Sequence, residues 1–423
     1  MSTSTSLLRI DLTDLRRRLS ADGYSRHTIR AYFSSVRQFL RYLDGRGIAL
    51  DAVDTSHVAA YMQRRLSQYR RAHRRTPPTL TRWRARCHGG IQHFLRATLS
   101  AWPRPPAARG LREALDRSTL HEYRERLGAT TDFAPGTIDG LLYEAGRFLT
   151  WRRERTGGTA DAALTLLDVD AYVKLRALSL RRTTCKTLVK RLAHFLSFMH
   201  QSGRVPDNLT ARLISPTVYQ YESIPSVLEP EQIAAVLSIA RRDRSAKGRR
   251  DYAILMLFAT YGLRAGEVTG LRLDDFNWRE ETLLVSHSKT RTQTILPLMP
   301  EVASAVFAYL RHGRPRVATR MLFIRMKAPF RGLSGGHGVQ ALVAERLAKA
   351  GVHPRGKCGP HIFRHARAVS LLRAHVPVKA IADILGHRSP RSTSAYLKLQ
   401  SDDLRAIALP VPTGREACRE RRV

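Results

Sequence analysis

Basic side chains at helical spacing precede a tyrosine near the C-terminal end of the chain. His361, Arg364 and Arg367 recur every third residue, so they share one face if this stretch is a helix. The buried side would be supplied by apolar residues of this helix and the next, namely Leu371, Leu372, Ile381 and Ile384. Tyr396 follows a second short helix that ends at 385–387. Cations on one face with a phenol nearby can grip a phosphodiester while the phenolic oxygen attacks it.

Other motifs of the C-terminal half follow one another in a definite order. Residues 259–268 read Ala-Thr-Tyr-Gly-Leu-Arg-Ala-Gly-Glu-Val, and 288–290 read Ser-Lys-Thr in the expected turn between two strands. Residues 361–365 read His-Ile-Phe-Arg-His, and 385–387 read Leu-Gly-His, whose histidine stands nine positions before Tyr396. In this order, over about 225–400, these segments resemble the motif boxes of the tyrosine recombinase (phage integrase) family.

The resemblance implies roles for two arginines and the groups around them. Arg264 and Arg364 would meet the negative charge that develops on the non-bridging phosphate oxygens, because a guanidinium keeps its proton. His387 would hydrogen-bond one of those oxygens. Glu267 would brace the basic cluster without reacting itself.

The resemblance also implies the path of two protons. Tyr396 would attack phosphorus, and its hydroxyl, with an ordinary pKa near ~10, must lose a proton as it does so. His361, or a group that it positions, would accept this proton. Lys289 would protonate the departing deoxyribose 5′-oxygen, and the scarcity of lysine in this chain favours a function for it. With a protein nucleophile and arginines for charge, the reaction would need no metal or nucleotide cofactor.

Each of these residues also has an ordinary structural interpretation. Lys289 could be a plain hairpin-turn lysine, the histidines could begin or cap helices, and Tyr396 could be a packing residue. Their joint order is what favours function. A zinc site is a further alternative, because a Cys-x-x-His step and a histidine pair four residues apart occur among His353, Cys358, His361 and His365. A second thiolate is missing there, so we expect no metal.

Composition points to a polyanionic partner. The chain has 423 residues, 43% hydrophobic residues and a formal net charge of +37, which fits a folded protein with several domains. The positive field favours nucleic acid, while a ribosome-associated or membrane-surface protein remains an alternative. The four cysteines show no paired spacing, and no signal peptide or membrane span is evident. We therefore expect a soluble, cytoplasmic protein associated with the nucleoid.

A repeat indicates two all-helical units, 1–105 and 112–218, joined by a proline-rich stretch. Helical patterns begin at 28–29 and 137–138, and each is followed by a short helix that holds Tyr61 or Tyr172. A basic helix containing His-Phe-Leu then closes each unit. Chance similarity between amphipathic helices is the alternative. The second unit resembles the family's core-binding domain, the helical half of a clamp around duplex DNA.

Arginines cluster in the first unit, and no acidic residue occurs from Thr55 to Arg112. A solvated helix face usually mixes charges, so an unrelieved positive run favours contact with a phosphate backbone. The candidate DNA-binding residues are Arg64, Arg65, Arg70, Arg71, Arg74, Arg75, Arg82, Arg84 and Arg86 in the first unit and Arg181, Arg182, Lys186, Lys190 and Arg191 in the second.

The remaining chain predicts a catalytic domain, 225–400, that is mainly α with a small antiparallel sheet. Residues 215–227 form the predicted linker, and helices are expected from about 229 and over 251–261. Strands are expected at 273–278, 282–287 and 292–298. The turn at 374–376 contains histidine where the family often has glycine, and histidine tolerates unusual turn dihedrals. The tail, 401–423, is expected to dock on a neighbouring subunit.

The resulting hypothesis is a site-specific recombinase or integrase, one that a mobile element could carry. It would cut and rejoin double-stranded DNA through a 3′-phosphotyrosyl intermediate, as a homo-tetramer in which related recombinases can also take part. A type IB-like topoisomerase and a catalytically inactive DNA-binding accessory protein are the alternatives.

Overall fold

The computed structural model describes Leu7 and residues 10–157, 163–219, 227–287, 292–333, 335–354, 356 and 358–386. By their contacts, these residues belong to two compact units. One comprises the described parts of Met1–Leu50, Leu66–Ser100 and Ser223–Val423, and the other those of Asp51–Arg65 and Ala101–Glu222. The domain boundaries given by the sequence stay a prediction. No helix within the described ranges is long and apolar enough to cross a membrane.

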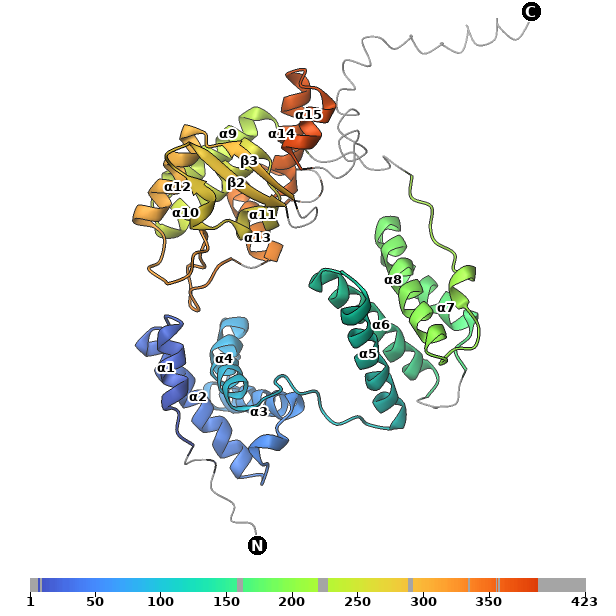
Figure 1. The fold of residues 1–423 in the computed structure, drawn as a ribbon. Helices are drawn as coiled ribbons and strands as arrows, with labels where there is room; N and C mark the ends of the chain where they lie inside the picture. The colour runs from blue at the N-terminus through green and yellow to red at the C-terminus, as the bar shows by residue number, and fades with distance from the viewer. Residues whose placement is uncertain are drawn as a thin grey trace, which may run out of the picture. The chain divides into compact units, whose positions relative to one another are not determined.

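In the described part of the first hundred residues, four helices and a short 3₁₀ turn lie between Thr13 and Thr98. They are α1 (Thr13–Ala21), α2 (Arg26–Asp44), η2 (Leu50–Ala52), α3 (Thr55–His73) and α4 (Leu80–Thr98) (Figure 1). The Ser25 side chain caps α2 by accepting a hydrogen bond from the Thr28 amide at 3.2 Å. Helices α2 and α4 pack together through fully buried side chains such as Val36 and Ile91. The helix that holds Tyr61 was expected to be short, but α3 has 19 residues.

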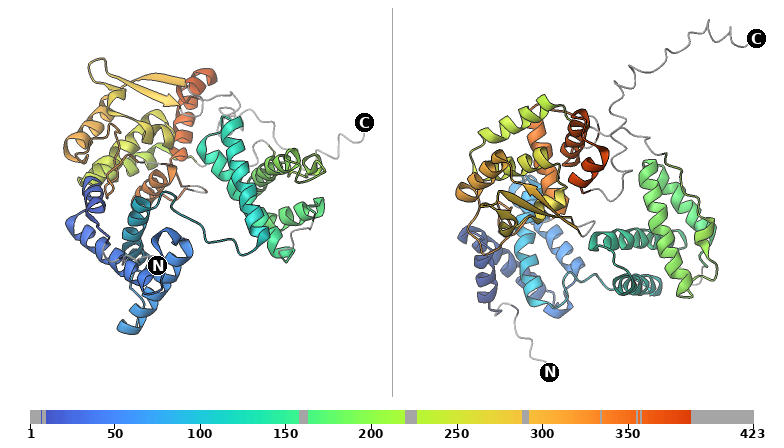
Figure 2. Two further views of the ribbon diagram at one scale, coloured as in Figure 1. Left: turned by 60° about the horizontal axis from the view of Figure 1, so that its bottom comes forward. Right: turned by 45° about the horizontal axis from the view of Figure 1, so that its top comes forward.

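A second series of four helices follows. It comprises α5 (Leu111–Thr130), α6 (Pro135–Arg155), α7 (Leu166–Ala177) and α8 (Arg182–Gln201), followed by η3 (Leu209–Arg212) (Figure 2). The two series of helices, which the sequence predicted to be similar, share one polar contact between a tyrosine and a histidine. The Tyr24 hydroxyl lies 2.9 Å from His93 Nε2, and the Tyr123 hydroxyl lies 2.8 Å from His194 Nδ1. In both series the histidine of His-Phe-Leu on the last helix therefore contacts a tyrosine from the beginning of the series.

The described part of 227–386 surrounds a three-stranded antiparallel sheet. Its helices are α9 (Pro230–Arg242), α10 (Ala246–Tyr261), α11 (Ala265–Gly270), η4 (Leu273–Asp275), α12 (Pro300–His312), α13 (Gly335–Lys349), α14 (His361–Arg373) and α15 (Val378–Ile384). The strands are β1 (Phe276–Asn277), β2 (Thr282–His287) and β3 (Thr292–Pro297), in the order β1-β2-β3. Helix α10 packs against α9, α12 and α14, and α11 contacts β2 (Figure 1). The fold is mainly α with a small sheet, as predicted.

Two predicted elements differ in extent. The strand expected at 273–278 is reduced to Phe276–Asn277, because Leu273–Asp275 forms a 3₁₀ turn. The Asp275 carboxylate closes this turn by accepting a hydrogen bond from the Arg272 amide at 2.8 Å. Helix α10 begins earlier than expected, since the Ser245 hydroxyl caps it by accepting from the Gly248 amide at 3.0 Å.

A buried ionic network joins α9, α10 and α13. Asp251 has no exposed surface and accepts hydrogen bonds from Arg250 Nη2 at 2.7 Å and from Arg346 Nη2 at 2.8 Å. Lys247 Nζ also reaches Asp251, at 2.9 Å, and Arg346 is bonded to Asp243 at 2.8 Å. The Asp251 carboxylate thus contacts two buried guanidinium groups, and Asp243 gives Arg346 a second counter-ion.

Helix α14 ends in a left-handed turn at a histidine. His375 has φ of 56°, and its amide donates to the Leu372 carbonyl at 2.9 Å. The Val376 amide donates to the Leu371 carbonyl at 3.0 Å, so the last turn of the helix is closed by two such bonds. The fold therefore forms with histidine at this turn, as the sequence predicted, and α15 can begin at Val378.

Candidate active site

Arg264 is placed by a sharp turn between α10 and α11. Gly262 ends α10 with φ of 65°, a conformation that suits glycine, and a Cβ added there would lie 2.9 Å from Leu385 Cδ2. Arg264 then begins α11. Its amide donates to Glu267 Oε2 and its Nη1 to Glu267 Oε1, both at 2.7 Å. Its Nη2 donates to the Gly386 carbonyl at 2.9 Å.

Arg364 reaches the same place from α14. It is 3% exposed, and its Nη1 donates to the Gly262 carbonyl at 2.9 Å. Its Nη2 donates to the Leu385 carbonyl. The two arginines, a hundred residues apart in sequence, therefore contact the carbonyls of consecutive residues, Leu385 and Gly386. The two guanidinium groups are therefore anchored to neighbouring points of the same backbone segment.

Glu267, which the sequence analysis expected to brace the basic cluster, contacts Arg264, and its bracing role stays a prediction. It is buried, which raises the pKa of its carboxyl group. Hydrogen bonds from the Arg264 amide, His287 and the Arg264 guanidinium outweigh that burial and hold the pKa below its ordinary value. Glu267 is therefore ionised at neutral pH, and it fixes the Arg264 guanidinium in one orientation.

His287 lies beside Glu267 and was not among the candidate residues taken from the sequence. Its Nδ1 lies 2.8 Å from Glu267 Oε1 and its Nε2 lies 3.0 Å from Thr294 Oγ1. A signal was present, because His287 shares the inward face of strand 282–287 with Leu283 and Val285. A polar residue at such a position must find partners when buried.

His361 begins α14 and is exposed, so it is open to solvent. The ring of His365 lies one turn along the helix, 6.3 Å from the His361 ring between centroids. Burial lowers the pKa of His365 to about 4, with further contributions from His361 and Arg364. His365 is therefore neutral at pH 7.

This depressed pKa predicts a loss of stability in mild acid. Between about pH 6.5 and 4 the unfolded chain binds a proton at His365 that the folded chain does not bind, so folding weakens as the pH falls. His365→Gln, which stays neutral, should lose less stability between pH 7 and pH 5 than the wild type. Melting temperatures of both proteins at the two pH values test this, and equal losses would contradict it.

Three predicted site residues lie outside the described residues, namely Lys289, His387 and Tyr396. The structure does describe the residues that precede Lys289 and His387 most closely, namely His287 and Gly386. Residues 288–291 connect β2 to β3, and His287 pairs with Thr292 in the register of these strands. Gly386, which precedes His387, is the acceptor of the Arg264 hydrogen bond.

The candidate DNA-binding cations lie on three helices and their ends. Of the first group, Arg64, Arg65, Arg70 and Arg71 are on α3, Arg82, Arg84 and Arg86 are on α4, and Arg74 and Arg75 are between the two helices. Arg182, Lys186, Lys190 and Arg191 are on α8, with Arg181 just before it. Most are exposed, while Arg65, Lys186 and Arg191 are half-buried. The side chains are thus accessible to a polyanion.

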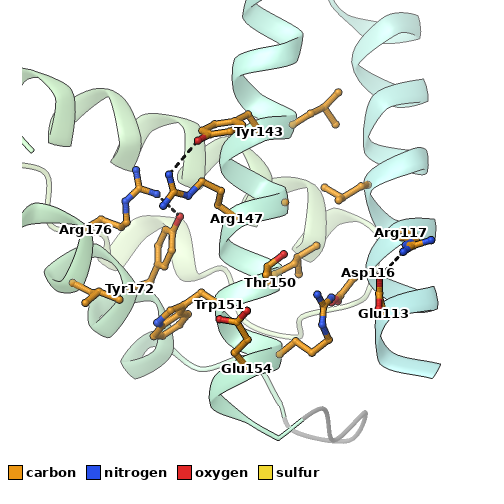
Figure 3. A pocket seen from close by; sticks show the side chains of 16 residues that line it. Glu113, Asp116, Arg117, Tyr143, Arg147, Thr150, Trp151, Glu154, Tyr172 and Arg176 are labelled. Carbon is orange, nitrogen blue, oxygen red and sulfur yellow. Dashed lines mark hydrogen bonds and ion pairs between the residues drawn. The ribbon is translucent and has the colours of Figure 1, made fainter. Parts of the chain in front are cut away.

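Metal-ligating side chains and cavities are the remaining features that could form a site. In the part of the chain that the structure describes, no three His, Cys, Asp or Glu side chains form a group that could hold a metal ion. A cavity of about 590 Å³ lies among α5, α6 and α7 (Figure 3). Its charged groups bond to neighbours, as Arg147 does to the Tyr143 hydroxyl and Arg176 to that of Tyr172, both at 3.1 Å. Such pairing is typical of structural groups.

Comparison with known proteins gives the family. The model of the phage integrase family matches residues 226–402, and that of the phage integrase N-terminal SAM-like domain matches residues 13–76. A protein of Sinorhizobium fredii (strain NBRC 101917 / NGR234) named as an integrase/recombinase, y4gC, is 56% identical over 45% of this chain and 97% of its own length. Another from that strain, y4rA, is 33% identical over 71% of this chain and 68% of its own length. The chain belongs to the phage integrase family of tyrosine recombinases, which are enzymes that break and rejoin DNA.

Solved structures support the fold. A structure of XerH site-specific recombinase bound to its palindromic difH substrate has a TM-score of 0.56 and 14% identity, over 71% of this chain and 97% of that chain. A lambda integrase dimer bound to a core site has a TM-score of 0.51 and 16% identity, over 66% of this chain and 94% of that chain. The SAM-like match falls on α1–α3, whereas the core-binding role was expected for 112–218. That assignment stays a prediction.

Proposed function

We propose that this chain is a site-specific recombinase of a mobile element, in which Tyr396 attacks the scissile phosphate. The observation that carries the proposal is the convergence of Arg264 and Arg364 on the carbonyls of Leu385 and Gly386. Two guanidinium groups held together by the fold can neutralise both non-bridging oxygens of one phosphate. The names of the relatives from Sinorhizobium fredii support the integrase assignment.

The reaction conserves the energy of the broken bond. The Tyr396 oxygen forms a bond to phosphorus, and the bond from phosphorus to the deoxyribose 5′-oxygen breaks. His361, which is exposed at the start of α14, accepts the phenolic proton, and Lys289 gives a proton to the 5′-oxygen. His387 hydrogen-bonds a non-bridging oxygen. Attack by a 5′-hydroxyl on the phosphotyrosine reverses these steps, so rejoining requires no nucleotide.

The basic helices bind the duplex in this proposal. The exposed arginines of α3 and α4 and the cations of α8 contact phosphates, which gives affinity with a strong dependence on salt.

A homo-tetramer brings two sites together in the cytoplasm, and related recombinases can supply some of its subunits. The segment 401–423, outside the described residues, docks on a neighbouring subunit. A solved structure of a lambda integrase tetramer on a Holliday junction, with a TM-score of 0.51, supports such an assembly by analogy.

Trapping on a suicide substrate tests the proposal. A nick next to the scissile phosphate lets a short 5′-hydroxyl fragment diffuse away, so the covalent adduct accumulates. Wild-type protein should form an adduct that maps to the peptide containing Tyr396, and Tyr396→Phe should form none while still binding DNA. The absence of a wild-type adduct would favour a DNA-binding accessory protein. Relaxation of supercoils without joined-site products would favour a type IB-like topoisomerase.

A further inference from the structure

We propose that His287 is a positioning residue for the cleavage reaction, because it holds Glu267, and through it Arg264, in the orientation that receives the phosphate. The inference rests on the proposed function, since it assigns His287 a part in the same active site. His287 is not expected to touch DNA. Its effect is expected to pass through the carboxylate that it contacts.

The imidazole of His287 lies at the junction of four segments. It is 2% exposed and belongs to β2, while its two nitrogens contact Glu267 on α11 and Thr294 on β3. The fourth segment is the turn at Gly386. A Cβ added to Gly386 would lie only 2.7 Å from His287 Cε1 and 2.9 Å from each ring nitrogen, so the ring packs directly on this backbone.

The hydrogen bonds of Glu267 explain why the contact matters. Its Oε2 accepts from the Arg264 amide, and its Oε1 accepts from Arg264 Nη1 and lies 2.8 Å from His287 Nδ1. The Arg264 bonds tie the carboxylate only to a neighbour three residues away. His287 is the contact that ties Oε1 to the sheet, and so it limits rotation of the carboxylate that orients the guanidinium.

An apolar residue at position 287 would fill the same space with a smaller desolvation free energy than histidine. Strand β2 points Leu283 and Val285 inward, and a leucine in place of His287 would continue this buried face. A histidine there must be desolvated, and its two hydrogen bonds compensate for that loss. The desolvation of this histidine costs free energy that an apolar side chain would not cost. Because the histidine contacts Glu267, which orients Arg264, we attribute its presence to the positioning of Arg264 in the active site rather than to packing.

The test compares cleavage of two suicide substrates by the full chain. One has an ordinary scissile phosphate, and the other has a methylphosphonate, in which a methyl group replaces one non-bridging oxygen and removes the negative charge. A protein with a misplaced Arg264 should be slow on the phosphate and less impaired on the methylphosphonate, because less charge needs neutralising. Arg264→Ala provides the reference for that behaviour.

His287→Leu should cleave the phosphate substrate about 10–100-fold more slowly than wild type, the usual effect of losing a group that orients an active-site ligand. Its affinity for DNA should stay within about 2-fold, since phosphate contacts elsewhere supply most of the binding. On the methylphosphonate its deficit should shrink as that of Arg264→Ala does. His287→Asn, whose side-chain amide can still donate to Glu267, should recover most of the rate.

Three outcomes would overturn the inference. They are a wild-type cleavage rate for His287→Leu, an equal deficit of this variant on both substrates while that of Arg264→Ala shrinks, and no recovery in a folded His287→Asn protein. Thr294→Val offers a variant that leaves the histidine in place, and it should show a smaller deficit of the same kind. If wild-type protein forms no adduct at all, the proposed function itself has failed, and the two failures are thereby distinguished.

Discussion

Arg364→Ala is expected to slow strand cleavage by about 10²–10³-fold, the usual effect of removing one preorganised donor from a developing oxyanion. Arg364 is 3% exposed and donates to the Gly262 and Leu385 carbonyls, so its guanidinium is held in one orientation before DNA binds. Stability should fall as well, since each buried carbonyl that loses its partner costs about 1–3 kcal/mol. Single-turnover cleavage and thermal melting measure the two effects separately.

Arg364→Lys is the matched control. Lysine keeps the positive charge, but its single ammonium group cannot reproduce the planar fork that donates to two carbonyls. We expect a rate between those of wild type and Arg364→Ala, with DNA affinity close to wild type in both variants. A cleavage rate for Arg364→Ala within about 3-fold of wild type would remove this residue from the active site.

Asp251→Ala is expected to cost about 3–5 kcal/mol of stability, because it leaves the buried Arg250 guanidinium without a carboxylate and removes one of the two carboxylates that Arg346 contacts. Asp251 accepts from Arg250 at 2.7 Å and from Arg346 at 2.8 Å, and Arg346 is only 1% exposed. Neither guanidinium can be neutralised by losing a proton. The transition of this part of the chain should shift down by about 10 °C in calorimetry.

Two control variants test whether burial and charge explain the loss of stability in Asp251→Ala. Asp251→Asn keeps the shape but not the charge, so its cost should lie below that of Asp251→Ala. Glu345→Gln removes an exposed carboxylate that also contacts Lys247, at 2.9 Å, and should cost under about 1 kcal/mol. Similar effects from Glu345→Gln and Asp251→Ala would mean that burial does not set the strength of this network.

The elements near the site could largely be predicted from local patterns. Strand β2 was expected at 282–287 and is found there, because alternation of apolar residues defines a half-buried strand. The helix that begins at His361 follows equally from the spacing of its residues. The strand expected at 273–278 was wrong in extent, since the Arg272 backbone amide donates a hydrogen bond to the Asp275 carboxylate, and this bond favours a turn that residue propensities do not reveal.

The contacts within the site could not be predicted in the same way. Nothing in the order of the motifs indicates that Arg264 and Arg364 meet at Leu385 and Gly386, because the approach depends on the packing of α10 against α14. His287 stood beside the candidate lysine in sequence, yet its role depends on two partners supplied by other elements. Long-range partners of this kind are fixed by tertiary structure.

The anchoring of Leu385 and Gly386 by these same cations has a consequence for redesign. In the proposed mechanism, the chain continues from this backbone to Tyr396, so the groups that would receive the phosphate also hold the start of the segment that would carry the nucleophile. A substitution that changes the charge of Arg264 or Arg364 is therefore also expected to change the position of the attacking Tyr396 oxygen. Directed evolution of the enzyme should therefore find paired substitutions, one near Arg264 or Arg364 and one between Gly386 and Tyr396.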